Sequence, residues 1–282
     1  MVKIISDSTC DLSRELLERY DVDIVPLHVL MGDSEYEDGV DIMPDEIYAW
    51  SDANKTTPKT SAASLERVIE IFKPYIDNGQ EIVSFSISED MSTSANVMRL
   101  AARELNAEER IKVINSANLS TGIGLQVIEA ALMAKEGKTA EEIERRIEEI
   151  KPRIRTSFVV DTLTYLYRGG RCSGLAAMAG GVLKLHPRIS VADGKMSPGK
   201  KYRGNISKAV MDYVKDMEES LKNAEPSRAF ITHSGCDRQL LDTVRSYLEG
   251  LGMFEEILET RAGGVISSHC GPGTLGVLFI EK

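Results

Sequence analysis

The residues best suited to chemistry gather near the carboxyl end of the sequence, in the segment Gly263–Gly276. It contains His269, one of four histidines in the chain, with Ser267 and Ser268 before it and Cys270 after it. Five glycines and a proline in these fourteen residues predict a loop rather than a helix or a plain strand, because glycine allows unusual backbone angles and close approach. An imidazole in such a loop can donate or accept a proton near neutral pH. The segment is therefore either part of a binding site or a tight turn with a structural histidine.

Two hydroxyl-rich segments can supply partners for this imidazole. Thr60 and Ser61 belong to the loop Lys55–Ser64, and Ser92 belongs to Ser88–Ser94; each segment precedes a predicted helix. Hydroxyl donors and free backbone N–H groups at a helix N-terminus favour an anion. Neutral donors with one histidine suit a single carboxylate whose attached chain is buried, since fixed hydrogen bonds replace its lost water. The commoner role for Ser61 and Ser92 is helix capping, and that alternative stays open.

Signatures of known catalytic machinery are mostly absent. The sequence has no Gly-x-Ser-x-Gly motif, and Ser268 adjoins His269, which is poor geometry for a nucleophile and its base. The segment Gly194–Lys201 imitates a phosphate-binding loop, but a lysine stands where Ser or Thr would bind magnesium, and a hairpin is predicted there. No dinucleotide-binding Gly-x-Gly-x-x-Gly follows the first strand. These absences favour a receptor over a catalyst.

Composition narrows the partners and the location. The chain has 282 residues and a net charge of −10, which disfavours nucleic acid and anionic membrane surfaces. We find no signal peptide and no apolar run of the roughly 20 residues that a membrane helix needs, so we expect a cytoplasmic protein without stable membrane insertion. The four scattered cysteines argue against disulfides. A zinc site would need the adjacent ligands His269 and Cys270 beside His233 and Cys236, so we expect no metal and no cofactor.

The first half of the chain alternates strands, polar turns and helices, which is typical of a mainly parallel sheet covered by helices. Strands are predicted at 3–7, 24–31, 81–87 and 111–114, and helices at 13–20, from 44, from 65 to 79, from 94 to 105, from 122, and from a capping box at 139–142 to 153. In such sheets ligands bind where the carboxyl ends of strands meet helix N-termini. The hydroxyl-rich segments are predicted to lie at that edge.

The second half changes character. A strand at 156–160 and a short helix lead to Tyr167-Arg-Gly-Gly-Arg171, and 174–181 consists almost entirely of small residues that allow close packing. Two strands flank a hairpin turn at Asp193–Gly194, and a long helix is predicted over 205–224. Strands at 228–232, 255–260 and 275–280 and a helix at 237–250 complete the pattern. We expect two α/β domains, 1–155 and 156–282, the second with a mixed sheet.

Several short motifs occur together in an order that resembles the DegV family of bacterial fatty-acid-binding proteins. The resemblance spans essentially the whole chain. The motifs are Ser6-Asp-Ser-Thr-Cys-Asp11, Thr60-Ser61 after Pro58, Tyr167-Arg-Gly-Gly-Arg171, Asp193-Gly194 with Lys201-Tyr-Arg-Gly204, and His269-Cys-Gly-Pro-Gly273.

The resemblance implies a two-domain protein that holds one long-chain fatty acid between its domains. The carboxylate would be bound by Thr60, Ser61, Ser92 and His269. The resemblance also implies a partner, an ATP-dependent fatty-acid kinase that makes an acyl phosphate for phospholipid synthesis. This chain would then be the non-catalytic subunit that presents the substrate, with Arg203 engaging the kinase. Arg171 is a second candidate for that contact, with a structural role as its alternative.

Two segments depart from the family pattern. The family usually has Ser-Gly-Thr-Tyr where this chain has Ser92-Thr-Ser-Ala95, and Thr-Ser-Gln-Pro-Ser where it has Thr60-Ser-Ala-Ala-Ser64. The departures affect the helix start around Ser92 and the acyl-chain preference. Two other functions stay open: a hydrolase or transferase that acts on a small carboxylate or phosphate with His269 as general base, and a regulatory lipid-binding module.

Overall fold

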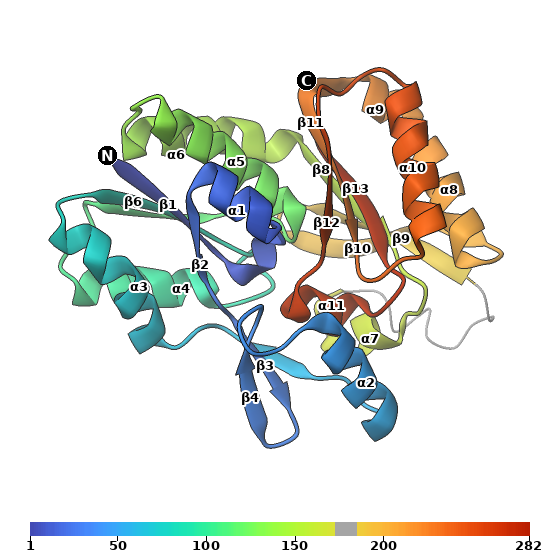
Figure 1. Ribbon diagram of the computed structural model, residues 1–282, viewed down its shortest axis with the longest axis horizontal. Coiled ribbons are helices and arrows are strands. Elements are labelled where there is room, and N and C mark those ends of the chain that lie inside the picture. Colours follow the sequence, from blue (N-terminus) through green and yellow to red (C-terminus); the bar gives the residue numbers. More distant parts are fainter. Residues whose placement is uncertain (173–184) are drawn as a thin grey trace.

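The computed structural model describes residues 1–172 and 185–282, which form three sheets flanked by helices (Figure 1). The small-residue run predicted at 174–181 lies outside the described residues. In the parts that the structure describes, no helix is both long and apolar enough to span a membrane.

The first sheet is wholly parallel, as predicted, with strand order β2–β1–β6–β7. Its strands alternate their side chains between two helical layers, because successive residues of a strand point to opposite faces. Ile4 packs in the cluster that includes α5 and α6, whereas Ile5 packs in the cluster that includes α3 and α4. The elements are β1 (Val2–Asp7), β2 (Val22–Val25), β6 (Glu81–Ser86), β7 (Ile111–Asn115), α1 (Arg14–Tyr20), α3 (Leu65–Asp77), α4 (Ser94–Glu104), α5 (Thr121–Lys135) and α6 (Ala140–Ile150).

Helix α5 is the element that joins the two halves of the molecule. It contacts β1 and β6 of the first sheet and also β8 and β13 of the second. The part of a helix that lies between two sheets has no solvent face, so it is mostly apolar on all sides rather than amphipathic. Residues Ile123 to Ile128 are accordingly all buried.

The strand predicted at 24–31 is two strands that belong to different sheets. Pro26 follows β2 and has no backbone N–H to continue the ladder. The chain then turns into β3 (His28–Met31), the middle strand of a small antiparallel sheet. The predicted loop Lys55–Ser64 likewise contains a strand, because β5 (Lys59–Ser61) pairs with β3. The remaining elements here are β4 (Ser34–Glu37), α2 (Pro44–Asn54) and the short turn η1 (Ser8–Cys10).

The second large sheet is mixed, as predicted, with order β10–β9–β8–β13–β11–β12 and only β11 and β12 parallel. The helix predicted over 205–224 is two helices that meet at Met217, and no glycine or proline marks this break. The elements are η2 (Lys151–Arg153), β8 (Ile154–Val159), α7 (Thr164–Gly169), β9 (Leu185–Ala192), β10 (Lys195–Arg203), α8 (Ile206–Asp216), α9 (Glu218–Lys222), β11 (Ala224–His233), α10 (Arg238–Gly250), β12 (Ile257–Arg261), α11 (Gly264–Cys270) and β13 (Leu275–Glu281). The division into domains 1–155 and 156–282 stays a prediction, although the chain enters this sheet at Ile154.

Candidate ligand-binding site

His269 lies on helix α11, so the loop predicted for Gly263–Gly276 is wrong over its first half. Three glycines of this segment stand at the ends of the helix, Gly273 and Gly276 follow it, and none stands in its interior. Gly263 is the N-cap, and Gly271 ends the helix with φ of 74°, a backbone angle that favours glycine. The number of glycines predicted a loop, but glycine is compatible with a helix when it lies at the helix termini.

Two buried carboxylates hold the start of α11. The N–H of Gly263 donates to Asp11 Oδ1 at 2.8 Å, and the N–H of Gly264 donates to Asp38 Oδ1 at 2.5 Å. Each carboxylate also accepts a hydrogen bond from a hydroxyl group: Ser120 donates to Asp11, and Ser8 donates to Asp38. A side chain at position 264 would clash, because a Cβ there would lie 2.8 Å from Asp38 Oδ1. The start of α11 is therefore fixed from the opposite end of the sequence.

These carboxylates and Asp7 have raised pKa values because they are buried. Burial raises the pKa of Asp11 to about 8 and that of Asp7 to about 6, and it also raises the pKa of Asp38. Hydrogen bonds to each carboxylate oppose the rise. Asp7 also fixes the loop after β6, because its Oδ2 accepts the N–H of Ile87 at 2.8 Å. The Ser6–Asp11 motif thus positions two walls of the site, and all of its residues except Ser8 are buried.

We expect Asp11→Asn to flatten the dependence of stability on pH. With a pKa of about 8 in the folded protein against an ordinary 3.8, Asp11 binds more protons when folded than when unfolded between these values. Its contribution to the free energy of unfolding is therefore full at low pH and is lost as pH rises toward 8. Urea denaturation between about pH 5 and pH 8 measures this slope, which should be smaller in the variant. Asp45→Asn is the matched control, because Arg261 lowers the pKa of Asp45; equal slopes in all three proteins would contradict the prediction.

The structure brings the four predicted carboxylate-binding residues to one cavity of about 460 Å³. This volume falls within the range of roughly 300–1,000 Å³ that is usual for small-molecule sites. Thr60 and Ser61 reach the cavity from β5, rather than from the helix start that the sequence indicated, while Ser92 precedes α4 and His269 lies on α11. The rest of the lining is mostly apolar and comes from both halves of the chain: Leu27, Ile87, Met91, Leu119, Met196, Val265, Ile266 and Cys270, with Glu89, Thr93 and Arg171.

His269 is bonded to Thr60 within this cavity. The imidazole Nε2 lies 2.8 Å from Thr60 Oγ1, and Nδ1 is buried without a hydrogen-bond partner. Burial, with a smaller effect from the charge of Arg171, lowers the pKa of His269 to about 4, so the ring is neutral at pH 7. We assign the ring proton to Nε2, because burying Nδ1 as an acceptor without a donor costs less free energy than burying it as an N–H group without an acceptor. Thr60 then accepts from His269, and its own hydroxyl proton is free to point toward a ligand.

The two serines differ in their surroundings. Ser92 Oγ lies 2.9 Å from Ser94 Oγ and accepts the N–H of Ser94 at 3.3 Å, so it partly fills the capping role that was its alternative. Ser61 is exposed and makes no side-chain hydrogen bond within the described residues. Ser92 is therefore partly committed to the start of α4, and Ser61 is free to bind.

The two arginines predicted to contact a partner lie apart. Arg171 lines the cavity and donates to the carbonyl of Gly169 at 2.7 Å. The next residue, Cys172, bridges to Met196 near the start of β10, whereas Arg203 ends that strand, roughly 20 Å further along. Arg203 is exposed and does not line the cavity.

Gly169 is a site residue that sequence reasoning missed. A Cβ at this position would lie only 2.3 Å from His269 Nδ1, so the absence of a side chain lets α7 pack directly against the imidazole. Its φ is not in the left-handed region, which makes the restriction steric. The available signal is the Gly169-Gly170 pair within the Tyr167-Arg-Gly-Gly-Arg171 motif, in which only Arg171 was predicted to have a role.

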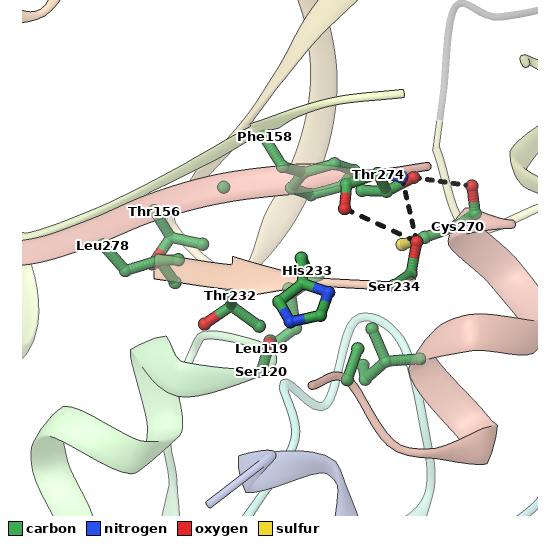
Figure 2. A pocket seen from close by; sticks show the side chains of 13 residues that line it. Leu119, Ser120, Thr156, Phe158, Thr232, His233, Ser234, Cys270, Thr274 and Leu278 are labelled. Carbon is green, nitrogen blue, oxygen red and sulfur yellow. Dashed lines mark hydrogen bonds between the residues drawn. The ribbon is translucent and has the colours of Figure 1, made fainter. Parts of the chain in front are cut away.

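A smaller chamber of about 30 Å³ adjoins the cavity between the two halves, and the two share Leu119, Ile266 and Cys270 (Figure 2). Phe158 and Leu278 of the second sheet supply much of its apolar wall. Ser234 closes the wall on one side, where it accepts the N–H of Thr274 at 2.9 Å (Figure 2). It also donates to the carbonyl of Gly271 at 2.5 Å. The apolar surface therefore extends beyond the hydroxyl-lined cavity.

The residues weighed for zinc serve other purposes. His233 Nδ1 accepts the N–H groups of Gly235 and Cys236 and so closes the turn after β11. In residues 1–172 and 185–282 no group of three or more His, Cys, Asp or Glu side chains is arranged to hold a metal ion.

Fold and cavity together define a two-domain α/β protein with a largely apolar cavity between the halves and a few neutral polar donors in it. The chain belongs to the DegV family, whose model, described as an uncharacterised protein family, matches residues 1–282. A DegV domain-containing protein of Clostridium perfringens is 31% identical over 281 residues, covering 100% of this chain and 99% of the relative. One of Caldanaerobacter subterraneus subsp. tengcongensis is 32% identical with the same coverage.

Solved structures share the fold over the full length. One is a DegV family protein of Thermus thermophilus that binds fatty acid. Its TM-score is 0.90 at 29% identity, and the match covers 100% of this chain and 99% of that one. A stearic-acid-binding protein of Eubacterium ventriosum has a TM-score of 0.86 at 30% identity with the same coverage. The expected fold of two α/β domains is confirmed by these likenesses.

Proposed function

We propose that this protein binds one long-chain fatty acid, with the carboxylate at Thr60, Ser61, Ser92 and His269, the last acting through the Thr60 hydroxyl that it orients. The observation that carries the proposal is the cavity itself, which is lined by these four side chains and otherwise by mostly apolar residues. The fatty-acid-binding relatives with the same fold support it.

The donors suit a carboxylate better than a phosphate. Thr60, Ser61 and Ser92 are neutral, and His269 is neutral at pH 7 because burial lowers its pKa to about 4. A monoanion can exchange its water for such hydrogen bonds, whereas a dianionic phosphate ordinarily needs arginine, lysine or a metal. Arg171 is the single cation of the described cavity lining, and it supplies long-range attraction. The acyl chain would run along Leu119 and Ile266 toward the smaller chamber.

The direct test is to denature the purified protein and identify what it releases by mass spectrometry. We expect a fatty acid at about one per chain. A protein that releases none and also fails to take up oleate or palmitate would rule the proposal out.

A catalytic role for His269 is disfavoured by its surroundings. A general base is usually oriented by a carboxylate or carbonyl on its second nitrogen, and here Nδ1 has no such partner within the described residues. A pKa of about 4 also leaves it a weak base at pH 7. Turnover of a small ester or phosphate by the protein alone would revive the hydrolase alternative.

Residues of the smaller chamber are predicted to set acyl length. Ala262→Val fills part of the chamber, so we expect the released lipids to shift toward shorter chains. Leu278→Ala enlarges it and should shift them toward longer chains, although the variant should be less stable by about 2–5 kcal/mol. Both variants are compared with wild type by mass spectrometry of lipids from cells on the same fatty-acid mixture. An unchanged distribution in both would show that the chain ends elsewhere.

We further propose that the protein is non-catalytic and presents its fatty acid to an ATP-dependent kinase. Arg203 and Lys201 support a contact with an acidic partner, because both are exposed at the end of β10 and neither has an ion-pair partner in the described part of the chain. Their neighbours Lys200 and Lys208 are paired with Asp216 and Asp212.

Arg203→Ala is expected to leave fatty-acid binding intact and to lower acyl-phosphate formation by the cognate kinase. Loss of one charged contact should reduce kcat/KM by about tenfold or more. Lys208→Ala is the matched control, since it removes an exposed cation that already has a partner. Equal turnover of the two variants would remove Arg203 from the contact, and a lipid that no kinase of the same cell phosphorylates would favour the regulatory alternative.

A further inference from the structure

A second groove lies between the two halves, at the opposite end of β1 from the candidate site. It encloses about 930 Å³ and is lined by Val2 and Ile4 of β1, Leu132 of α5 and Arg228 of β11. Val2 precedes Asp7 by five residues, so roughly 17 Å of strand separates this groove from the end of β1 that faces the candidate site. In Figure 1 the amino end of β1 is at the upper left, whereas helix α11 lies in the lower centre of the molecule.

Arg228 is the unusual residue of this groove. Arg228 is only 9% exposed, and its Nε is buried without an acceptor. Its guanidinium makes no hydrogen bond or ion pair with any described residue. Arginine stays charged at all ordinary pH values. Buried arginines are almost always paired, because removing the charge from water without a partner is costly. The groove is the space from which an acceptor can reach this guanidinium.

An irregular piece of backbone presents Arg228 to the groove. Ala224 pairs with Glu281 and Ala229 pairs with Phe279, so four residues of β11 stand against one residue of β13. Such bulges redirect side chains and are frequent beside binding sites. Two bonds fix the bulge: the N–H of Glu255 donates to the carbonyl of Pro226 at 2.7 Å, and the N–H of Ala229 donates to that of Glu256 at 3.0 Å.

The acids of the groove do not neutralise Arg228. Glu256 is engaged by Arg19 at 2.6 Å, and Asp21 is engaged by Lys3 at 2.7 Å. Glu255 is exposed at the rim. The apolar part of the lining comes from Met1, Val2, Ile4, Ala131, Leu132 and Ala134, and Tyr20, Lys135 and Ser227 also line the groove.

We propose that this groove binds an amphipathic oxyanion, meaning a carboxylate or phosphate group that carries a hydrocarbon chain. The guanidinium of Arg228 binds the anionic group, for which its planar fork is suited, and the hydrocarbon lies against β1 and α5. The site shares no residue with the cavity at His269 and does not depend on the function proposed for that cavity.

The experiment titrates the whole protein, first saturated with palmitate, by isothermal calorimetry with decyl phosphate, decanoate and inorganic phosphate. We expect a decyl compound to bind and inorganic phosphate to bind more weakly, because it lacks a hydrocarbon chain. The tighter of the two decyl compounds identifies the preferred anionic group. Arg228→Gln should weaken that binding by about tenfold or more, since bonds to a charged group are lost. Lys135→Gln, which removes an exposed cation of the same groove, should weaken it by no more than about threefold.

Two further measurements separate binding from structure. Without a probe, Arg228→Gln should melt no lower than wild type, because it removes an unpaired buried charge, and palmitate binding at the other site should be unchanged. The proposal is overturned by equal affinity of Arg228→Gln and wild type, by no binding of either decyl compound at millimolar concentration, or by a large drop in melting temperature that makes Arg228 structural. Failure of palmitate uptake alone would count against the function of the other cavity and not against this groove.

Discussion

Replacing Thr60 by valine is expected to lower fatty-acid affinity by about 1–3 kcal/mol, which is roughly 5- to 150-fold. Valine keeps the shape of threonine and removes only the hydroxyl. The carboxylate then loses a donor in a half-buried place, and His269 Nε2–H loses the acceptor that lies 2.8 Å away. His269→Ala should weaken binding by a similar amount, although its imidazole reaches the ligand largely through Thr60. Binding of a fluorescent fatty acid, displaced by palmitate, measures both variants.

The coupling between these two residues is the sharper part of the prediction. If His269 acts by orienting the Thr60 hydroxyl, removing either residue disables the same unit. The double variant should then lose less binding free energy than the two single variants lose in sum, by at least about 0.5 kcal/mol. Ser64→Ala is the control from the same segment: Ser64 caps α3 and does not line the cavity, so stability should fall by about 1 kcal/mol with affinity unchanged. Additive effects of Thr60→Val and His269→Ala would mean that the two bind the ligand independently.

Local sequence patterns predicted the parallel sheet and its helices well. The capping box of Thr139 and Glu142 is present as expected, because both of its bonds form between residues three apart. Residues that meet only through the fold were harder to predict. No local pattern predicted that Asp11 and Asp38 bind the start of α11, more than two hundred residues further along the chain.

The candidate site divides in the same way. Residue types indicated donors for an anion, and those side chains do line one cavity. Their secondary structure was partly wrong, since Thr60 lies on a strand and His269 on a helix. Pairing of β5 with β3 over only three residues leaves no periodic pattern to detect. The burial of Arg228 could not be predicted either, because no local sequence pattern indicates the bulge in β11.

Substituting alanine for Gly169 is expected to disrupt the site more than removing any single donor. The new Cβ would lie 2.3 Å from His269 Nδ1, so either the imidazole or helix α7 must move. Overpacking of this kind usually costs about 1–3 kcal/mol of stability. A displaced imidazole also loses its bond to Thr60, so we expect fatty-acid affinity to fall by at least about tenfold. Thermal melting and the displacement assay measure the two effects separately.

Gly170→Asn provides the neighbouring control. Gly170 has φ of 68°, which asparagine tolerates better than most residues, and a Cβ there would meet nothing within 4 Å. This variant should bind fatty acid as wild type does, with at most a small loss of stability. A second check combines Gly169→Ala with His269→Ala: because the alanine at 269 removes the ring that the new methyl group meets, the double variant should recover much of the stability that Gly169→Ala loses. Without that recovery, the restriction on position 169 would come from the backbone of α7 and not from the imidazole.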